Sequence, residues 1–288
     1  RDSSTSRGLG DVYKRQPFSL EMMCSTFDIR FNQSPGAVLA LTNGRRMGIT
    51  YSYRNKRHYM SGGAFMDNEV NNLKKASHGY ALDGRVVYRP VLDSKKLIHI
   101  GFAANYRTPN ESLNEEDKNI FIYKSPGVST IDNRNIAMAT IDHAAYQIKF
   151  GTELLVYYHR FCLQSEYIRT HVERDNAFKN YVAQGAYLQC SWLLSGETYL
   201  YDESVACAGR PEGKSLEVCS RFNYLTLNDE DAAIWGGEQK DISIGLNYYI
   251  NKYIGIKLNY SYLMPGASIK EISRKNFSVF QGRFQFIF

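Results

Sequence analysis

Basic side chains recur at alternate positions in this sequence, on one side of each extended segment. In 46–54 (RMGITYSYR), Arg46 and Arg54 fall on the side opposite to the apolar residues. In 80–90 (YALDGRVVYRP), Arg85 and Arg89 share a side with Asp83. Successive side chains of a strand point to opposite faces, so each segment has one apolar and one basic face. A guanidinium group keeps its charge and binds phosphate or carboxylate through two parallel hydrogen bonds, so the expected chemistry is anion binding.

The same alternation, continued along the chain, defines a set of candidate anion-binding residues. Carboxylates fall on the same face or near strand ends, and they could instead pair with the arginines and brace the structure. The basic candidates are Arg46, Arg54, Arg85, Arg89, Arg107, Arg221, Lys257 and Arg283. The competing carboxylates are Asp83, Glu153, Glu166, Glu197, Glu217 and Asp241.

Motifs typical of enzymes or metalloproteins are weak. The stretch 208–215 (AGRPEGKS) approximates a phosphate-binding loop, but an alternating strand follows where that loop needs a helix. The histidines lack H-E-x-x-H spacing, and the five cysteines lack C-x-x-C spacing. No convincing cluster of Ser, His and carboxylate is found. We therefore predict no enzyme, no cofactor and no metal, and incidental thiols, with a Cys207 to Cys219 pair as the less favoured alternative.

The elements that carry the basic residues are expected to be about twelve membrane strands. The clearest hairpin is 241–262, where Ile242, Ile244 and Leu246 alternate with polar residues and a turn at Asn251 leads into a second strand of the same kind. Its length matches the roughly 10-residue strand of an outer-membrane barrel. Segment 17–31 is ambiguous because Met22 and Met23 break the alternation. The polar stretch 108–142 is expected to be a long extracellular loop.

The composition favours an all-β protein. The sequence of 288 residues is 14% aromatic with 22 Tyr, and its mean hydropathy is −0.41. No apolar run approaches the roughly 20 residues of a membrane-spanning helix, whereas lumen residues and loops dilute the hydropathy of a barrel. We therefore predict a transmembrane antiparallel β-barrel. A soluble β-sandwich is the alternative, and it would have to bury the apolar rows between two sheets.

Residues 1–16 (RDSSTSRGLGDVYKRQ) have no strand or helix period, and we interpret them as a non-native linker segment. The net charge is +6, and it is +4 without the four basic and two acidic residues of this segment. A charge of this size falls short of what nucleic-acid binding requires. Residues 17–288 are then predicted to be the C-terminal part of a single barrel domain. A signal peptide is expected upstream.

Several stretches together resemble the phosphate- and polyphosphate-selective porins O and P, particularly Bacteroidetes-type members. The last strand, FSVFQGRFQFIF at 277–288, also resembles the closing strand of Gram-negative outer-membrane barrels. The order and spacing of the stretches match over nearly all of 17–288. They are PFSLE at 17–21, GRRMGITYS at 44–52, GRVVYRPV at 84–91, LIHIGFAANYR at 97–107, LQSEYI at 163–168, SWLLSGETYLYD at 191–202, GLNYYIN at 245–251 and RFQFIF at 283–288.

The resemblance implies a sixteen-stranded porin that forms homotrimers, with about four N-terminal strands outside this chain. It implies an arginine-lined lumen that passes phosphate, polyphosphate and other small anions across the outer membrane of a Gram-negative bacterium. It also implies contact with outer-membrane lipid and lipopolysaccharide, and an assembly signal at Phe284, Phe286 and Phe288 read by the barrel-assembly machinery. The alternatives are a general diffusion porin without anion selectivity and a barrel that acts mainly as a scaffold or adhesin.

Overall fold

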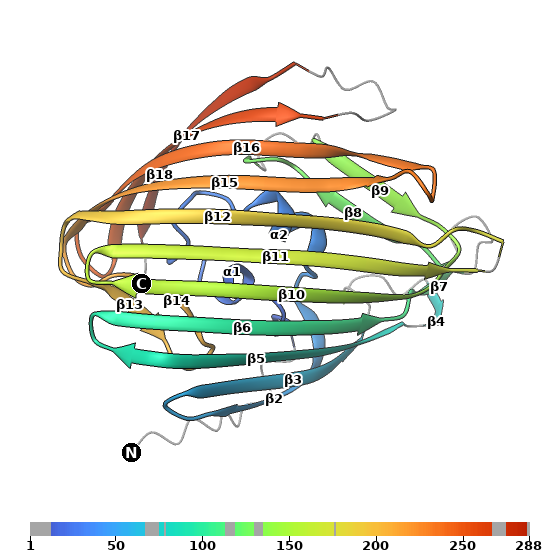
Figure 1. Ribbon diagram of the computed structural model, residues 1–288, viewed down its shortest axis with the longest axis horizontal. Helices are drawn as coiled ribbons and strands as arrows, with labels where there is room; N and C mark the ends of the chain where they lie inside the picture. Colours follow the sequence, from blue (N-terminus) through green and yellow to red (C-terminus); the bar gives the residue numbers. More distant parts are fainter. Residues whose placement is uncertain are drawn as a thin grey trace.

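The protein, described here by a computed structural model, is almost entirely β-structure (Figure 1). The structure describes residues 13–66, 75–77, 79–112, 119–129, 135–175, 177–266 and 275–286. A twelve-stranded antiparallel sheet dominates it, and each strand pairs with its neighbours in the order given. The strands are β1 (Tyr13–Lys14), β2 (Arg46–Arg54), β3 (His58–Met66), β5 (Tyr80–Asp93), β6 (Lys96–Arg107), β10 (Ala144–Tyr158), β11 (Phe161–Arg174), β12 (Tyr181–Ser195), β15 (Ser215–Asp229), β16 (Ile234–Tyr249), β17 (Ile254–Pro265) and β18 (Phe277–Phe286).

Tight turns join several strand pairs at one end of the sheet. β2 and β3 are joined through Asn55, whose side chain accepts the backbone N–H groups of Arg57 and His58 at 2.8 and 2.7 Å. β10 and β11 are joined through His159, which has a φ of 52°. Asn251 makes the same kind of turn between β16 and β17 by accepting from Tyr253 and Ile254. The turn predicted at Asn251 is therefore confirmed, and Asn55 and His159 make two further turns at the same end of the sheet.

The convex face of the sheet is apolar and exposed. The outward side chains predicted from alternation include Ile49, Ile244 and Phe280, which are 82%, 55% and 73% exposed. This arrangement inverts that of a soluble domain, because large apolar groups cover the outside and polar groups fill the inside. No helix among the described residues is long and apolar enough to span a membrane. The predicted all-β fold with one apolar face per strand is confirmed.

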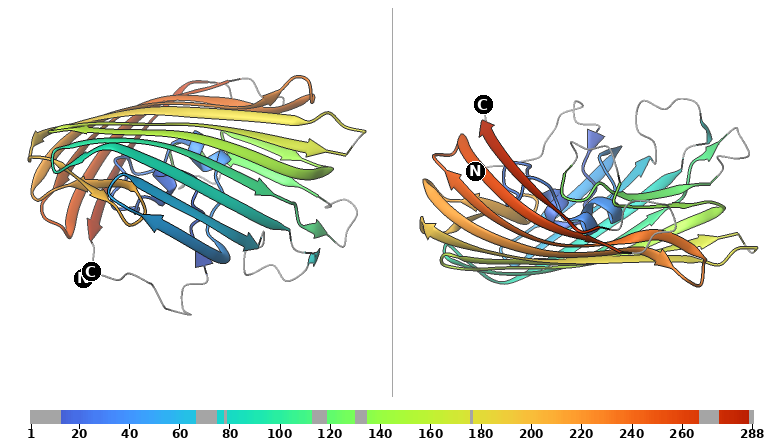
Figure 2. Two further views of the ribbon diagram at one scale, coloured as in Figure 1. Left: turned by 60° about the horizontal axis from the view of Figure 1, so that its bottom comes forward. Right: turned by 90° about the horizontal axis from the view of Figure 1, so that it is seen from above.

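Three inserted elements lie against the concave face (Figure 2). The first is segment 15–45, which carries the short helices α1 (Leu20–Met23) and α2 (Gly36–Leu41). The second is the hairpin of β8 (Phe121–Ser125) and β9 (Ala137–Ile141), and the third is the hairpin of β13 (Tyr199–Asp202) and β14 (Cys207–Pro211). A further small pair, β4 (Lys75–Ser77) with β7 (Glu111–Ser112), joins two of the interstrand connections.

These insertions settle two sequence expectations. The ambiguous segment 17–31 is not a wall strand, and Ser19 caps α1 within it by accepting the N–H of Met22 at 3.3 Å. The stretch 108–142 is only partly a loop, because it contains the β8–β9 hairpin. One side of that hairpin, including Phe121, Tyr123 and Ile141, is at most 2% exposed. The expectation of an open extracellular loop was wrong for this part, because its alternating apolar residues find an apolar surface inside the sheet.

An apolar core joins the insertions to the wall. Val38 and Leu41 of α2 pack with Tyr123 of β8 and with Tyr187 of β12, all nearly inaccessible to solvent. The close approach depends on Gly185 of β12, where a Cβ atom would lie 2.7 Å from the Cβ of Ala37. The interior of the sheet is therefore a filled, partly apolar space, with its polar groups distributed around that core.

β1 and β18 are the two ends of the strand order, so the sheet is curved but is not a closed barrel. Twelve strands agree with the number expected, although β1 lies within segment 1–16. Phe284 and Phe286 lie on the outward face of β18 and are 57% and 51% exposed. Phe288, the third residue of the expected assembly signal, lies outside the described residues, as do residues 1–12.

Candidate functional site: the concave face of the sheet

Three of the candidate cations hold segment 15–45 against the wall. Lys257 of β17 donates to the carbonyl oxygens of Phe27, at 3.2 Å, and Ile29. Arg221 of β15 donates to the carbonyl of Gln33 at 2.9 Å, and Arg283 of β18 donates to that of Asn32 at 2.6 Å. The three strands therefore direct a lysine and two arginines at one stretch of backbone, 27–33, whose carbonyl oxygens accept their hydrogen bonds.

A second group forms around Glu153 of β10. Arg85 of β5 binds this carboxylate through Nε and Nη2, at 2.9 and 2.8 Å to Oε1. His99 of β6 contacts the same carboxylate through Nε2 at 2.9 Å and the hydroxyl of Tyr201 through Nδ1 at 2.9 Å. Arg85 also donates to two carbonyls of the β13–β14 connection, those of Val205 and Ala206, both at 2.7 Å. Arg85 is fully buried, and its charge is matched by a buried carboxylate.

Arg89 and Arg107 lie toward opposite ends of the interior. Arg89, at the turn end, donates to the carbonyls of Asn55 and His58 and lies 3.8 Å from the carboxylate of Glu203. Arg107, at the other end, is half-buried, and its guanidinium lies 4.7 Å from the ring centre of Phe121. Its Nη1 also contacts Asn43 at 3.4 Å. Both residues therefore contact an insertion or a turn as well as the wall.

The remaining two candidates are on β2, near one end of the strand order. Arg46 is half-buried beside β1, and Arg54 is exposed where the strand ends. The surroundings of the eight candidates therefore differ from fully buried to exposed.

Three buried cations of the described residues, Arg30, Lys149 and Arg174, were not among the candidates. Arg174, at the end of β11, binds the backbone carbonyl and the carboxylate of Asp142. Arg30 lies in segment 15–45, where its Nε is 3.2 Å from Glu217 and its guanidinium lies over Tyr199. Lys149 of β10 donates to Asn43 at 3.1 Å. Lys149 alternates with apolar Ile148 and Phe150, so its sequence did carry the signal. Arg30 carried none, because its segment has no regular period.

The carboxylates have several different roles. Glu217 and Glu153 neutralise arginines, as the bracing alternative expected. Glu166 instead accepts the backbone N–H groups of Leu20 and Glu21 at 3.0 and 2.8 Å, which secures the start of α1. Asp83 accepts from Asn105, and Asp241 from Asn223 and Gln239. Glu197 is exposed and contacts Lys95 at 3.2 Å.

One carboxyl group of the inserted segment is held away from water. Glu21 is 2% exposed, and Gln164 of β11 donates to it at 2.7 Å. Burial raises the pKa of Glu21, although Arg221, Gln164 and Arg30 oppose that rise. This group therefore retains its proton to a higher pH than an exposed glutamate.

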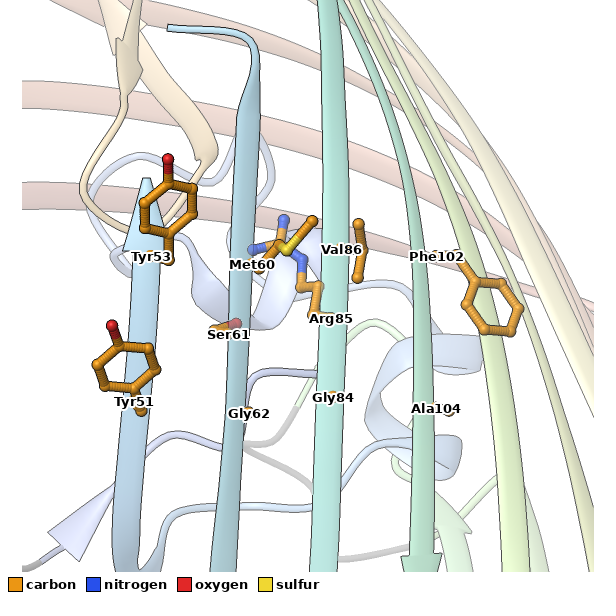
Figure 3. A pocket seen from close by; sticks show the side chains of 10 residues that line it. All are labelled: Tyr51, Tyr53, Met60, Ser61, Gly62, Gly84, Arg85, Val86, Phe102 and Ala104. Carbon is orange, nitrogen blue, oxygen red and sulfur yellow. The ribbon is translucent and has the colours of Figure 1, made fainter. Parts of the chain in front are cut away.

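A hollow with a mixed polar and apolar lining adjoins Arg283, and its apolar side chains are Phe27, Ile29, Leu39, Phe284 and Phe286. Its volume is about 600 Å³, and segment 26–39 and β18 line it with Thr26, Asn32, Gln33 and Ser34 on one side and Arg283 and Gln285 on the other. Among the described lining residues, Arg283 is the charged one. A hollow of about 520 Å³ on the convex side is different, because aromatic side chains surround small residues there (Figure 3). It lies over Gly62, Gly84 and Ala104, which are neighbours in register.

A curved antiparallel sheet with an apolar convex face and a polar, partly filled concave face that carries both basic and acidic side chains is the architecture of a porin β-barrel wall. The sequence comparison gives the family: the chain belongs to the phosphate-selective porins O and P, whose family model matches residues 13–288.

Two relatives illustrate the extent of this similarity. A Caulobacter vibrioides protein with no assigned function is 26% identical over 235 residues, or 76% of this chain and 46% of that protein. Porin O of Pseudomonas aeruginosa is 26% identical over 113 residues, or 35% of this chain and 26% of that protein. The chain thus spans less than half the length of each relative.

Proposed function

We propose that the protein is part of an outer-membrane channel through which small anions, phosphate and polyphosphate among them, diffuse passively. The observation that carries the proposal is the hollow beside Arg283, where a guanidinium is the charged group among the described lining residues. Arg283 and its neighbours Lys257 and Arg221 donate to backbone carbonyls. Glu217 interacts with Lys257, and Glu21 and Asp241 interact with Arg221, so Arg283 is the cation of this group on which the proposal depends most. Cations on a low-dielectric wall raise the local anion concentration and lower the barrier to entry.

We further propose that residues 1–16, which include β1, lie outside the native fold, and that about four additional strands complete the barrel between β18 and β2. This proposal is supported by the exposed ends of the strand order and by the share of the relatives that the chain covers. Assembly as a homotrimer in outer-membrane lipid and lipopolysaccharide, and recognition of the last strand by the barrel-assembly machinery, are parts of the same proposal. They rest on family membership and on the exposed Phe284 and Phe286.

Planar-bilayer recording tests the anion preference. With the whole protein under a KCl gradient, we expect a reversal potential of the sign that marks chloride as the more permeant ion, and we expect added phosphate to reduce chloride current. Arg283→Gln should move the reversal potential toward zero. Lys240→Gln is the matched control, because it removes one positive charge from an exposed side chain of β16. A preference for potassium in the unmodified protein would refute the proposal.

A general diffusion porin without anion selectivity is the second candidate. It is favoured by the Arg85–Glu153 and Arg30–Glu217 ion pairs, which cancel two of the interior cations. The same recording separates the two candidates, because an unselective pore gives a reversal potential near zero that Arg283→Gln does not change.

A further inference from the structure

Two thiols from different insertions meet inside the sheet. Cys24 directly follows α1 in segment 15–45, and Cys207 begins β14 of the third insertion. Their side chains hydrogen-bond to each other and are 3% and 2% exposed. Both belong to one apolar cluster with Leu20 and Tyr199. All five cysteines are free thiols in this structure.

We propose that Cys24 and Cys207 form a disulfide that links segment 15–45 to the β13–β14 hairpin. The bond would join two insertions that are far apart in the sequence and that both contact the candidate cations. Segment 15–45 binds Lys257, Arg221 and Arg283 through its carbonyls, and the hairpin connection binds Arg85. The link would therefore fix the relative positions of the two groups of interior cations.

The reaction is a thiol–disulfide exchange with a disulfide oxidant of the cell envelope. The thiolate of one cysteine attacks the oxidant, which gives a mixed disulfide and releases one thiol. The second cysteine then attacks the mixed disulfide, so the Cys24 Sγ to Cys207 Sγ bond forms and the oxidant leaves as its second thiol. The two cysteines lose two electrons and two protons, and the oxidant gains them. This step rests on the proposed outer-membrane location, since disulfides persist in oxidising compartments.

The surroundings of the thiols indicate when the bond forms. The hydrogen bond with Cys207 and burial hold the pKa of Cys24 well above its usual range, so little thiolate is present once the interior has packed. The oxidant also has no path to side chains that are so deeply buried. Oxidation therefore precedes the final packing of the two insertions, and reduction of the folded protein is slow.

Two other buried cysteines provide matched controls. Cys162 of β11 is 1% exposed and lies 3.9 Å from the guanidinium of Arg30. Cys219 of β15 is 2% exposed and lies 3.7 Å from the amide of Asn247. Each of these two thiols is contacted by a polar side chain, Arg30 for Cys162 and Asn247 for Cys219. Cys219 is also the residue that the sequence analysis named as the less favoured partner of Cys207.

Peptide mass spectrometry tests the link directly. The whole protein is refolded in detergent with oxidised glutathione as the oxidant, unfolded in an alkylating agent and digested without reduction. We expect one linked peptide pair that contains Cys24 and Cys207, absent after reduction and in Cys24→Ser and Cys207→Ser. It should persist in Cys162→Ser and Cys219→Ser. Complete alkylation of Cys24 and Cys207 in the unmodified protein, or a Cys207 to Cys219 link, would overturn the proposal.

A conductance measurement tests the consequence for the pore. Protein refolded with the bond intact should give steady single-channel currents, whereas Cys207→Ser should give larger current fluctuations because the two insertions move independently. If mass spectrometry shows the disulfide but the currents of Cys207→Ser are unchanged, the disulfide does not affect the conducting path. The linkage test needs no channel activity, so its outcome is separate from that of the proposed function.

Discussion

The two groups of interior cations are held in different ways. Around Glu153, Arg85 contacts a buried carboxylate, and the pair is further enclosed by His99 and Tyr201. Around segment 27–33, Lys257, Arg221 and Arg283 contact backbone carbonyls. An ion pair cancels the field of its cation, while a carbonyl leaves most of that field in place. The Glu153 group is therefore suited to stabilising the wall. The segment 27–33 group has carboxylates nearby, Glu217 for Lys257 and Glu21 for Arg221, but its cations donate to carbonyls, and it is the group to which the proposed function assigns the attraction of anions.

Arg85→Met should have the largest effect on stability. It leaves the 5% exposed carboxylate of Glu153 without its guanidinium, and removal of one member of a buried ion pair costs about 3–5 kcal/mol. The free energy of unfolding, measured by urea titration in detergent micelles, should fall by that amount. Lys95→Met is the control, because its pair with Glu197 is exposed and such pairs contribute roughly 0–1 kcal/mol. Similar losses in the two variants would show that Arg85 and Glu153 are not a structural pair.

Gly101→Ala should disturb the same group without removing a charge. A Cβ atom at this position of β6 would lie 2.2 Å from Oε1 and 2.5 Å from Cγ of Glu153. Displacing a carboxylate that Arg85 and His99 both hold should cost roughly 1–3 kcal/mol, as other overpacked interiors do. Gly84→Ala on the neighbouring strand is the matched control, since no atom lies within 4 Å of its added Cβ. If urea titration gives the two alanine variants equal stability, the Glu153 side chain is mobile.

Lys257→Met tests the group around segment 27–33. The buried carbonyls of Phe27 and Ile29 lose their donor, at a cost of about 1–3 kcal/mol in unfolding free energy. The reversal potential should also move toward zero, whereas Arg85→Met combined with Glu153→Gln, which removes both charges of the pair, should leave it unchanged in channels that still insert. A shift in this double variant that equals the shift in Lys257→Met would remove the proposed distinction between the two groups.

Glu21→Gln should have the smallest effect and should depend on pH. The pKa of Glu21 is raised in the folded state, so above its ordinary value of 4.5 the unfolded chain releases this proton before the folded protein does. This residue therefore destabilises the fold progressively as the pH rises from 4.5 through its folded pKa. Glutamine can accept the same bond from Gln164 without a charge. The melting temperature of the variant should exceed that of the unmodified protein at pH 8 and match it at pH 4.

The wall was predictable from the sequence because each strand carries its own signal. Alternation over many residues identified the outward row of Ile242, Ile244 and Leu246 and the inward Asp83, Arg85 and Arg89, and the turn residues marked the strand ends. When a strand has one buried polar face and one exposed apolar face, the direction of each side chain can be predicted from that strand's own sequence, without knowing which strands lie beside it. The family resemblance, read from ordered stretches along the chain, pointed to the same fold.

The insertions were harder to predict because their structure depends on distant partners. α1 spans four residues, too few for a helical period, and its first N–H groups are bound by Glu166, about 145 positions away. The β8–β9 hairpin had a detectable alternation, in which buried Phe121 and Tyr123 flank exposed Ile122. It was obscured by the polar residues around it. The partners of the cations could not be predicted for the same reason, since segment 27–33 has no period that would place it beside β15, β17 and β18.

The bond between Arg283 and Asn32 joins positions 251 residues apart, whereas many of the wall strands pair with the next strand in the chain. Local pairing brings a small loop-closure cost, so the wall can grow hairpin by hairpin. Segment 27–33 can bind Arg283 only after the last strand has joined. The conducting interior should therefore be the slowest part of the protein to fold, and a barrel wall can be complete before its pore reaches its final width.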